Sequence, residues 1–462
     1  MVFSGLPFLF FFLPAALALY YLAPRRAKNG VLCLVSIVFY AWGEPVYVTL
    51  MLFSIAVNFA YGRHAERRGP SRPALALIVV LNLALLGFFK YAGLLAVTLR
   101  ALGLPVPVPD LPLPIGISFY TFQALSYVID VYRGRCEVQR SLIDFGCYLA
   151  MFPQLIAGPI VRYISVADQL RDRRETIEGF AAGIGLFAIG LAKKALLANQ
   201  FGLLWTVCSA APPAAMTALT AWIGVAAFAL QIYFDFSGYS DMALGLGRMF
   251  GFTFPINFRY PYAARSVTEF WRRWHITLSS WFREYVYIPL GGNRVSPPRH
   301  ILNIAVVWTL TGIWHGAAWN FALWGAYFGL LLVLEKYVWK NLLEKAPAWC
   351  GHLYCLTAVC VGWVFFCFTS APEALGYLAV MFGGPAGGSL DFALYQIISY
   401  GPLFIIGALG CTRLPAALWE KLRRKAPAAA AWAGAALAVG ALFLCLAYIV
   451  NSGYNPFLYF RF

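Results

Sequence analysis

The run Ile301-Leu-Asn-Ile-Ala-Val-Val-Trp-Thr-Leu-Thr-Gly-Ile-Trp314 carries no charged residue and is followed directly by His315. This composition is typical of a helix in hydrocarbon, where a spanning helix needs roughly 20 mostly apolar residues and satisfies its own backbone hydrogen bonds. Similar runs recur along the chain, in which 61% of the 462 residues are hydrophobic and 12% are charged. Because soluble domains carry about 25% charged residues, we predict an all-α polytopic membrane protein.

Apolar runs alternate with short polar loops throughout, and no hydrophilic stretch is long enough to fold separately. We therefore expect one transmembrane domain over 1–462 with about ten to twelve crossings. The 217–250 run contains acidic residues and glycines and is expected to bend or split, whereas 142–161 is expected to enter the membrane and turn back. The candidate spans are 5–22, 31–43, 46–62, 74–99, 114–132, 142–161, 179–198, 217–250, 301–315, 318–338, 352–370, 374–383, 397–411 and 428–450.

The net charge of +16 comes from 35 basic and 19 acidic residues. Basic residues cluster in short loops beside apolar runs, as at Arg25, Arg26 and Lys28, and the positive-inside rule places such loops in the cytoplasm. Topology and contact with anionic lipid explain this charge better than nucleic acid, so no nucleic-acid partner is expected. The first apolar run precedes its basic residues, which predicts a retained helix with a periplasmic N-terminus.

The ten cysteines are scattered through apolar segments without a CxxC pair or metal-like spacing. Cys350, Cys355, Cys360 and Cys367 do not share one helical face. Disulfides and zinc ligation stay open, but small polarizable core residues fit this pattern best. No metal site is expected.

Polar residues concentrate around Trp271-Arg-Arg-Trp-His-Ile-Thr-Leu-Ser-Ser-Trp-Phe282. Placed on one helix over 270–284, the aromatic residues and His275 share a face. This pattern predicts an amphipathic helix in the membrane interface or under a cavity. His275 is either functional or satisfied by a backbone carbonyl within an aromatic cluster. The arginines at or beyond the edge of the aromatic face are Arg272, Arg273 and Arg283.

His315 has small and aromatic neighbours. Gly316, Ala317 and Ala318 allow a backbone or a ligand to approach closely, and the flanking indoles, Trp319 among them, resemble the lining of a substrate channel. An ionisable side chain at membrane depth is costly and marks a functional site by default. The alternative is a buried histidine that links helices.

Two further acidic residues, Asp235 and Asp241, lie within an apolar run. Each could orient an imidazole or pair with a basic side chain, and a helix-linking role is as plausible as a catalytic one. Lys193 and Lys194 are expected to extend from a helix end toward water. The remaining histidines are interpreted as incidental: His64, His300 and His352.

Six stretches together resemble the membrane-bound O-acyltransferase family. The resemblance is to its bacterial branch, whose members acetylate alginate or transfer D-alanine to teichoic acid. They occur in family order across about 150–320, and the Trp271–Arg283 and Thr311–Trp319 elements are highly specific together. The stretches are Phe152–Ile160, Asp235–Asp241, Asn257–Tyr262, Trp271–Arg283, Tyr287–Asn293 and Thr311–Trp319.

The resemblance implies a ring of helices with re-entrant and in-plane segments around a thinned centre, where a cytoplasmic donor reaches an acceptor from the other side. It makes His315 the invariant-type histidine and His275 the second polar position. Transfer of an acetyl group from a thioester to a hydroxyl needs a base for the hydroxyl proton, a task that suits a neutral imidazole. His315 is expected to be this base or a transient acyl acceptor. Substrate-binding roles are expected for Trp271, Arg272, Arg273, Arg283, Asn257, Asp235, Asp241 and Trp319.

The donor implied by the resemblance is acetyl-CoA or another acyl thioester, with its phosphates attracted by the arginines, Asn257 as a candidate oxyanion donor, and no bound cofactor. The implied partners are a periplasmic protein of the SGNH-hydrolase type and the machinery of polysaccharide synthesis and export, at the bacterial inner membrane. The implied acceptor is an exopolysaccharide such as alginate. Two alternatives stay open: D-alanyl transfer from a carrier protein to teichoic acid, and a proton-coupled transporter, which would be expected to show inverted repeats.

Overall fold

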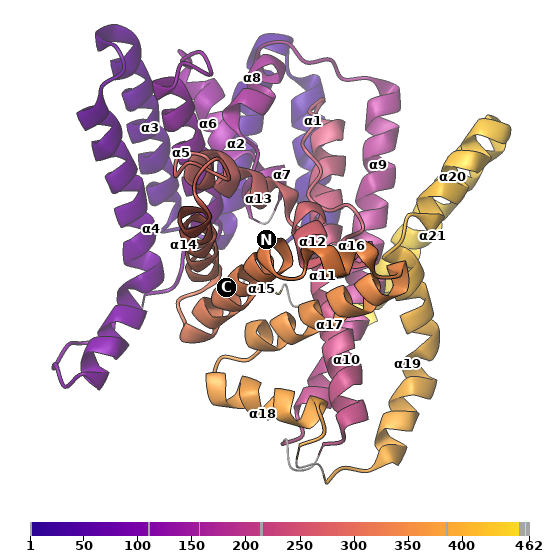
Figure 1. Ribbon diagram of the computed structural model, residues 1–462. Coiled ribbons are helices and arrows are strands. Elements are labelled where there is room, and N and C mark those ends of the chain that lie inside the picture. Colours follow the sequence, from indigo (N-terminus) through magenta and orange to yellow (C-terminus); the bar gives the residue numbers. More distant parts are fainter. Residues whose placement is uncertain are drawn as a thin grey trace. The chain divides into compact units, whose positions relative to one another are not determined.

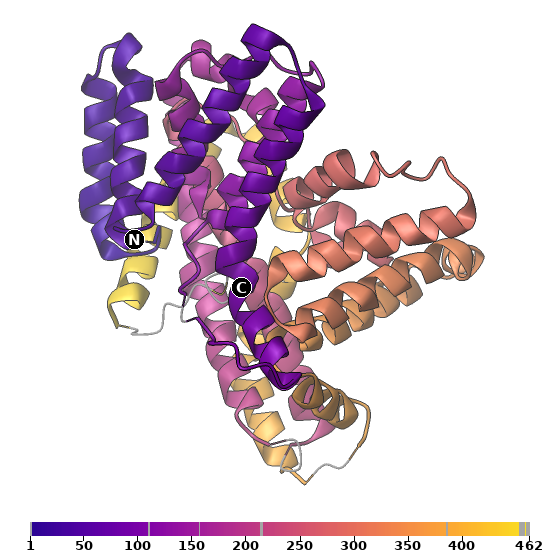
Figure 2. The ribbon, with the colours of Figure 1, turned by 90° about the vertical axis from the view of Figure 1, so that its left-hand side faces the viewer.

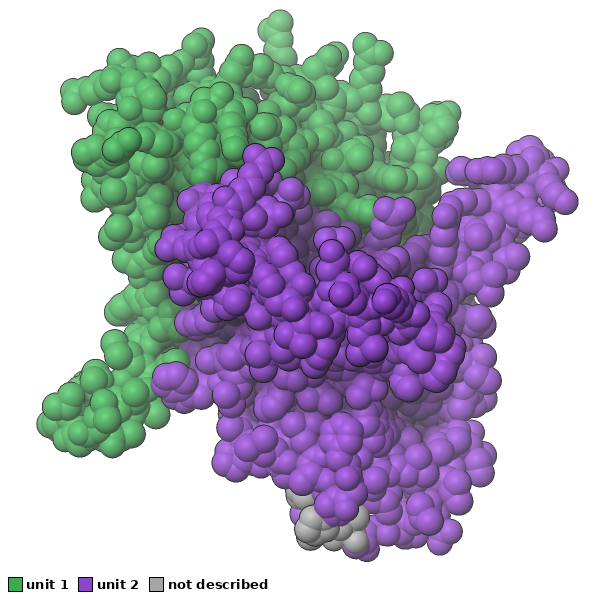
Figure 3. Space-filling model, in the orientation of Figure 1, with its two compact units in different colours: residues 1–187, 239–256 green, residues 188–238, 257–462 purple. Residues whose placement is uncertain are grey.

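The computed structural model describes residues 2–109, 111–156, 158–212, 216–384, 387–451 and 458. In these ranges the regular structure is helical and contains no β-strand (Figure 1). The predicted all-α class is confirmed. The helices group into two compact units, which are coloured separately in Figure 3: unit 1 comprises 1–187 and 239–256, and unit 2 comprises 188–238 and 257–462. The expectation of a single domain over 1–462 remains a prediction.

Unit 1 is built from apolar helices that pack along their lengths, and α3 and α4 run side by side (Figure 1). These two helices are joined by a pair of amide hydrogen bonds between the buried Asn58 and Asn82, at 3.1 and 2.9 Å. Polar bonds of this kind join helices where the hydrophobic effect between them is weak. The elements of unit 1 are η1 Phe8–Phe12, α1 Leu13–Leu22, η2 Arg25–Ala27, α2 Lys28–Gly43, α3 Val48–Arg68, α4 Arg72–Ala101, α5 Ile117–Tyr132, α6 Leu142–Ala150, α7 Phe152–Leu155 and α8 Tyr163–Arg171, with parts of α9 and α11.

The expected re-entrant segment 142–161 is broken into two short helices. Helix α6 ends at Ala150, Met151 takes a non-helical conformation, and α7 ends after one turn at Leu155. Pro153 lies in the first turn of α7, where its missing N–H costs no intrahelical bond. The break is therefore confirmed, while the return of the chain to one side of a membrane remains a prediction.

Unit 2 contains the segments singled out for chemistry. Its helices α14 and α15 form an antiparallel hairpin, seen edge-on in Figure 2. The two backbones lie very close, because a Cβ on Gly312 would be only 2.4 Å from the carbonyl oxygen of Phe321. The elements of unit 2 are η3 Lys193–Ala198, α10 Asn199–Ser209, η5 Pro261–Ala263, α12 Val267–Arg273, α13 Ile276–Phe282, η6 Arg283–Tyr287, α14 Pro297–His315, α15 Trp319–Tyr337, α16 Lys340–Lys345, α17 Ala348–Cys367, α18 Ala371–Met381, α19 Leu390–Gly410, α20 Leu414–Lys425 and α21 Pro427–Asn451.

Two long helices run through both units. Helix α9, Ile177–Ala192, continues through the π-helical segment η3 into α10 as one apolar stretch. Helix α11, Ala218–Met249, is continuous, so the predicted split of 217–250 is wrong. Its glycines serve close packing instead: a Cβ on Gly238 would lie 2.7 Å from the carbonyl oxygen of Gly190.

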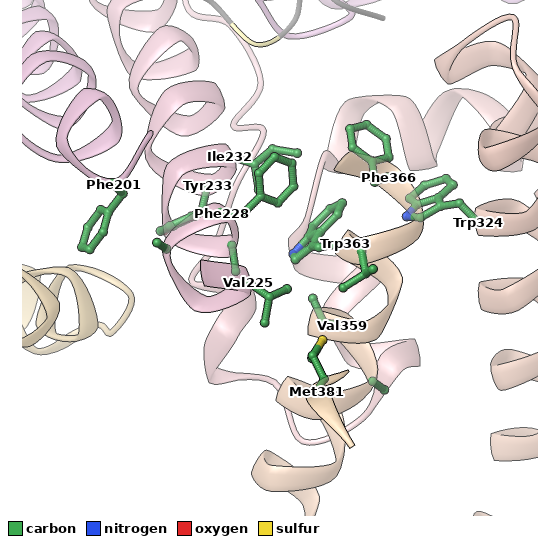
Figure 4. Close-up of a cluster of buried hydrophobic side chains, with 14 of the residues drawn as sticks. Phe201, Val225, Phe228, Ile232, Tyr233, Trp324, Val359, Trp363, Phe366 and Met381 are labelled. Atoms are coloured by element: carbon green, nitrogen blue, oxygen red, sulfur yellow. The ribbon is translucent and has the colours of Figure 1, made fainter. Parts of the chain in front are cut away.

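The core of unit 2 is strongly aromatic. Figure 4 shows Trp363 and Phe366 of α17 beside Trp324 of α15, and the rings of Trp324 and Phe366 have centroids 5.5 Å apart. Trp324 and Trp363 are fully buried. Large rings bury much apolar area with few rotatable bonds, and tilted or edge-to-face pairs add to that stabilisation. This core forms one wall of the site described below.

By length and composition alone, six of the described helical stretches could cross a membrane. They are Arg72–Ala101, Ile177–Ser209, Ala218–Met249, Ala348–Cys367, Leu390–Gly410 and Pro427–Asn451. The protein is thus a multi-pass membrane protein in its helix content. The expected count of ten to twelve crossings remains a prediction.

Candidate active site

His275 lies at a sharp break between two helices. Helix α12 ends at Arg273, His275 takes the left-handed conformation with φ 44°, and α13 begins at Ile276. The continuous helix predicted over 270–284 is therefore wrong. The cause is a pairing with a distant segment: the N–H of Ile276 donates to the carbonyl oxygen of Asn257 at 2.9 Å, and the carbonyl of Arg273 accepts from Arg259 at 2.9 Å.

The side chain of Asn257 fixes the His275 ring. Its Oδ1 lies 3.1 Å from Nδ1 of His275 and also accepts hydrogen bonds from the backbone N–H and the hydroxyl of Thr277, at 3.3 and 2.9 Å. Because Oδ1 accepts in this network, Nδ1 of a neutral imidazole carries the proton. The lone pair is then on Nε2, which is buried and has no hydrogen-bond partner among the described residues.

The surroundings of His275 are uncharged. The ring is 1% exposed and packs against Phe236, Phe258 and Trp314, with centroids at 4.7, 6.5 and 6.1 Å. Burial penalises the imidazolium and lowers the pKa of His275, which lies in the turn between α12 and α13, well below its usual value. The predicted aromatic setting is confirmed, but the partner is a side-chain amide rather than a backbone carbonyl. The ring is a neutral base with one open nitrogen.

His315 is the last residue of α14 and is 9% exposed. It sits among three rings, with centroid distances of 4.8 Å to Trp314, 4.9 Å to Trp324 and 5.3 Å to Phe366. Gly316 must be small, because a Cβ there would lie 2.1 Å from the ring of Phe321. The small residues after His315 thus admit an aromatic side chain close to the backbone.

The structure brings the two predicted catalytic histidines together. Trp314 contacts both rings, at 6.1 Å from His275 and 4.8 Å from His315. The segments that carry them, the α12–α13 turn and the end of α14, belong to the same unit. Two neutral-pH proton acceptors on one indole form a site in which a proton can be taken and returned.

The predicted arginines do not form one cluster. Arg273 pairs with Glu269 one turn earlier on α12, whereas Arg272 lines a cavity of about 610 Å³. Arg283 is exposed at the start of η6. Their contribution to substrate binding remains a prediction.

The two predicted tryptophans differ in position. Trp271 is buried, and its ring packs against Trp308, Trp324 and Phe328 at 4.8, 5.5 and 4.9 Å. Trp319 is 66% exposed at the first turn of α15. Trp271 thus supports the wall behind the site, and the binding role of each residue remains a prediction.

Asp235 forms a buried ion pair with Lys194. Lys194 Nζ lies 2.6 Å from Asp235 Oδ1, with both side chains almost fully buried, and Oδ2 accepts a hydrogen bond from the N–H of Leu458 at 2.9 Å. The expectation that Lys194 extends toward water is wrong, because the carboxylate compensates its charge inside the protein. The pair joins α11 to η3, which favours the helix-linking interpretation of Asp235. Asp241 is half-buried further along α11, in unit 1, and its role remains a prediction.

Sequence reasoning missed a network around His300. Its Nε2 lies 2.7 Å from the hydroxyl of Tyr287, and its Nδ1 lies 2.7 Å from the hydroxyl of Tyr337. Each partner comes from a different element, 13 and 37 residues away in the sequence, so no local pattern could reveal them. His300 is a built part of unit 2 rather than an incidental residue.

Sequence reasoning also missed Glu335 of α15, a buried carboxylate that caps α12. It accepts from the N–H groups of Val267 and Thr268 at 2.5 and 2.8 Å and from the Thr268 hydroxyl at 2.5 Å. Negative charge at a helix N-terminus satisfies free N–H groups and complements the helix dipole. Glu335 therefore holds the start of the helix that leads to His275.

Cysteine and metal chemistry play no visible part in this site. All ten cysteines are free thiols. In the part of the chain that the structure describes, no group of three or more His, Cys, Asp or Glu side chains could hold a metal ion.

The fold and the site define a multi-pass helical membrane protein with two imidazoles buried against one indole. A sequence model of the membrane-bound O-acyltransferase family matches residues 138–372, which include both histidines. A probable alginate O-acetylase from Azotobacter vinelandii is 42% identical, over 83% of this chain and 78% of its own length. A peptidoglycan O-acetyltransferase from Helicobacter pylori is 32% identical, over 81% and 79%.

A teichoic acid D-alanyltransferase from Bacillus subtilis is 25% identical, over 55% of this chain and 67% of its own length. The family match and the O-acetylase relatives cover the site and most of the sequence. The chain belongs to the membrane-bound O-acyltransferase family. It is an O-acyltransferase rather than a transporter.

Proposed function

We propose that the protein moves an acetyl group from a cytoplasmic acyl thioester, acetyl-CoA in the first place, toward O-acetylation of an exopolysaccharide such as alginate. The observation that carries the proposal is the pair His275 and His315 on the indole of Trp314. The alginate O-acetylase relatives, at 42% identity, favour this class of acceptor.

In this proposal His315 acts as the base. The acceptor hydroxyl attacks the thioester carbonyl while its proton passes to the imidazole, and the tetrahedral intermediate collapses with loss of the thiolate. The thiolate then takes the proton from the imidazolium, so the ring returns to its neutral form. General-base catalysis of this kind contributes roughly 10²–10⁴-fold to rate. The same ring could accept the acyl group transiently before passing it on.

His275 and Asn257 supply the polar surroundings of the reacting carbonyl. The Asn257 amide holds His275 through Oδ1, while its Nδ2 is buried with no hydrogen-bond partner among the described residues. Those free N–H groups can donate to an oxyanion, which a water-excluded site stabilises strongly. Nε2 of His275 offers an acceptor to the donor or the acceptor hydroxyl. Arg272 and Arg283 would attract the donor's phosphates.

The proposal places the protein in the bacterial inner membrane with a periplasmic N-terminus, because the basic loops favour the cytoplasmic side. Its partners would be a periplasmic protein of the SGNH-hydrolase type, which receives the acetyl group, and the machinery that makes and exports the polysaccharide. Asp241 and Trp319 would lie along the substrate path.

The central test replaces His315 by alanine in cells that lack their own copy of the protein. The acetyl-ester content of the secreted polysaccharide is measured at equal membrane levels of protein, and we expect a loss of at least about 100-fold. His352→Ala is the matched control, because it removes an imidazole of the same unit that bonds a backbone carbonyl outside the site. Normal acetylation by His315→Ala protein would refute the assignment of the base.

The donor is tested with purified protein in lipid vesicles. Acetyl-CoA and a D-alanyl carrier protein are supplied in parallel, and release of free thiol is followed for each. We expect release from acetyl-CoA. Release from the carrier protein alone would replace the proposal by D-alanyl transfer.

A further inference from the structure

A second site lies in unit 2, in the cavity of about 610 Å³. Neither His275, His315 nor Asn257 lines it, so it is separate from the proposed reacting groups. The cavity is formed by the start of α12, the loop before α14, the facing sides of α14 and α15, and α16. Its lining residues are Ser266, Thr268, Arg272, Tyr287, Asn293, His300, Ile304, Val307, Trp308, Leu332, Glu335, Lys336, Lys340, Leu343 and Glu344.

Three cations border the cavity: Arg272, Lys336 and Lys340. None of them forms an ion pair with a described residue. Of the two carboxylates in the lining, Glu335 is already engaged by the N–H groups and hydroxyl at the start of α12. Glu344 is exposed. The cavity therefore keeps an excess of positive charge that no carboxylate in its lining fully neutralises.

The His300 network holds one of these cations in place. Lys336 Nζ lies 3.4 Å from Nε2 of His300, whose two nitrogens also meet the hydroxyls of Tyr287 and Tyr337. Burial and the charge of Lys336 lower the pKa of His300, which stands before the apolar run of α14. The imidazole therefore stays neutral and adds no charge of its own. It can accept a hydrogen bond from Lys336 and so direct the ammonium group.

The rest of the lining is apolar. Ile304, Val307 and Trp308 come from α14, while Leu332 and Leu343 face them from α15 and α16. A cavity of this size is in the range of small-molecule sites, about 300–1,000 Å³. It is larger than a lone phosphate needs, and an inorganic anion would leave the apolar side unfilled.

We propose that this cavity binds a phosphate ester that carries an apolar body. The phosphate would lie among Arg272, Lys336 and Lys340, with Asn293 as a further donor, and the apolar part would lie against Trp308 and its neighbours. Basic pockets at the ends of membrane helices bind lipid headgroups in this way. The same chemistry has two sources: an anionic glycerophospholipid, or the nucleotide end of a thioester donor. Only the second source rests on the proposed function.

The test compares two double variants of the full-length protein in detergent. Lys336→Ala with Lys340→Ala removes two charges from the cavity. Arg299→Ala with Lys345→Ala removes two exposed charges from α14 and α16 that do not line it. Equal melting temperatures without ligand show that both variants are folded.

Two probes separate the sources. Retention of phosphatidylglycerol is counted by native mass spectrometry, and acetyl-CoA binding is measured by calorimetry. We expect at least one probe to bind the unaltered protein, with affinity reduced about 10-fold or more by the cavity variant and less than about 2-fold by the control. The proposal is overturned if neither probe binds, or if the two double variants bind alike.

The same measurement on His315→Ala protein separates this proposal from the proposed function. Its cavity is unaltered, so binding should persist whether or not acetylation is lost. Phosphatidylglycerol binding with no acetyl-CoA binding would support the site and assign it to lipid. Acetyl-CoA binding that the cavity variant abolishes would support the site and assign it to the donor.

Discussion

His275 and His300 are both buried imidazoles of unit 2, at 1% and 3% exposure, but they are satisfied differently. His300 has a tyrosine hydroxyl at each nitrogen. His275 has Asn257 at Nδ1 and no described partner at Nε2. Buried polar atoms are nearly always hydrogen-bonded, so an open one calls for a reason. The closed imidazole is structural, and the open one is available to a substrate.

The backbone strengthens this contrast. His300 lies in the first turn of α14, in an ordinary helical conformation. His275 has φ 44°, one of two non-glycine residues with positive φ among the described residues. Such conformations cost on the order of 1–3 kcal/mol and concentrate at functional sites. The protein therefore tolerates strain to present the ring of His275.

The largest expected effect is the loss of the open imidazole. Asparagine tolerates the left-handed conformation better than most residues, so His275→Asn removes the ring with little added strain. We expect polysaccharide acetylation to fall by roughly 10²–10⁴-fold at equal protein level. His352→Asn is the control and should retain near-normal acetylation. An active His275→Asn protein would show that the open nitrogen serves no reaction.

The next effect concerns the amide that holds His275. Asn257→Ala removes both the acceptor for Nδ1–H and the free Nδ2, and should lower acetylation by about 10²-fold. Thr277→Val removes one of the other hydrogen bonds to the same oxygen and should cost about 10-fold or less. The two variants are compared by acetyl-ester content. Equal losses would mean that Asn257 acts only as a structural acceptor.

A smaller effect is expected on stability at Glu335. Glu335→Gln turns one of its carboxylate oxygens into an NH₂ group that faces donors, so the cap of α12 loses an acceptor. We expect a destabilisation of about 1–3 kcal/mol, seen as a lower unfolding temperature in detergent. Glu344→Gln changes an exposed carboxylate of the same cavity and should stay within about 0.5 kcal/mol. A lowered unfolding temperature with Glu344→Gln alone would contradict the cap.

The smallest effect tests the closed imidazole. Tyr337→Phe removes one of the two hydroxyls on His300 from a side chain that is 42% exposed. The expected destabilisation is about 0.5–1.5 kcal/mol, measured by thermal unfolding. A loss of acetylation as large as that of His275→Asn would erase the distinction between the two rings.

Helix positions were largely predictable because apolar length sets them. The expected span 301–315 corresponds to α14, Pro297–His315, and 428–450 corresponds to α21, Pro427–Asn451. The predicted helix over 270–284 failed because distant residues compete for its hydrogen bonds. A local pattern carries no information about such partners.

The site was predictable to the extent that ionisable residues are rare in apolar sequence. That rarity identified His275 and His315, and the structure places both on Trp314. It could not identify Lys194 as the partner of Asp235, because the two lie on different elements. Glycines of α11 were interpreted as breaks, whereas their small size allows backbones to touch.

The π-helical turn η3, Lys193–Ala198, has a consequence for how this helix can vary. Such a turn holds more residues than an α-helical turn, and removing one would rotate everything after it by about 100°. Phe201, now buried, would then point in another direction. A one-codon deletion that a surface loop would absorb should therefore inactivate the protein here, and related sequences should show substitutions in this helix rather than gaps.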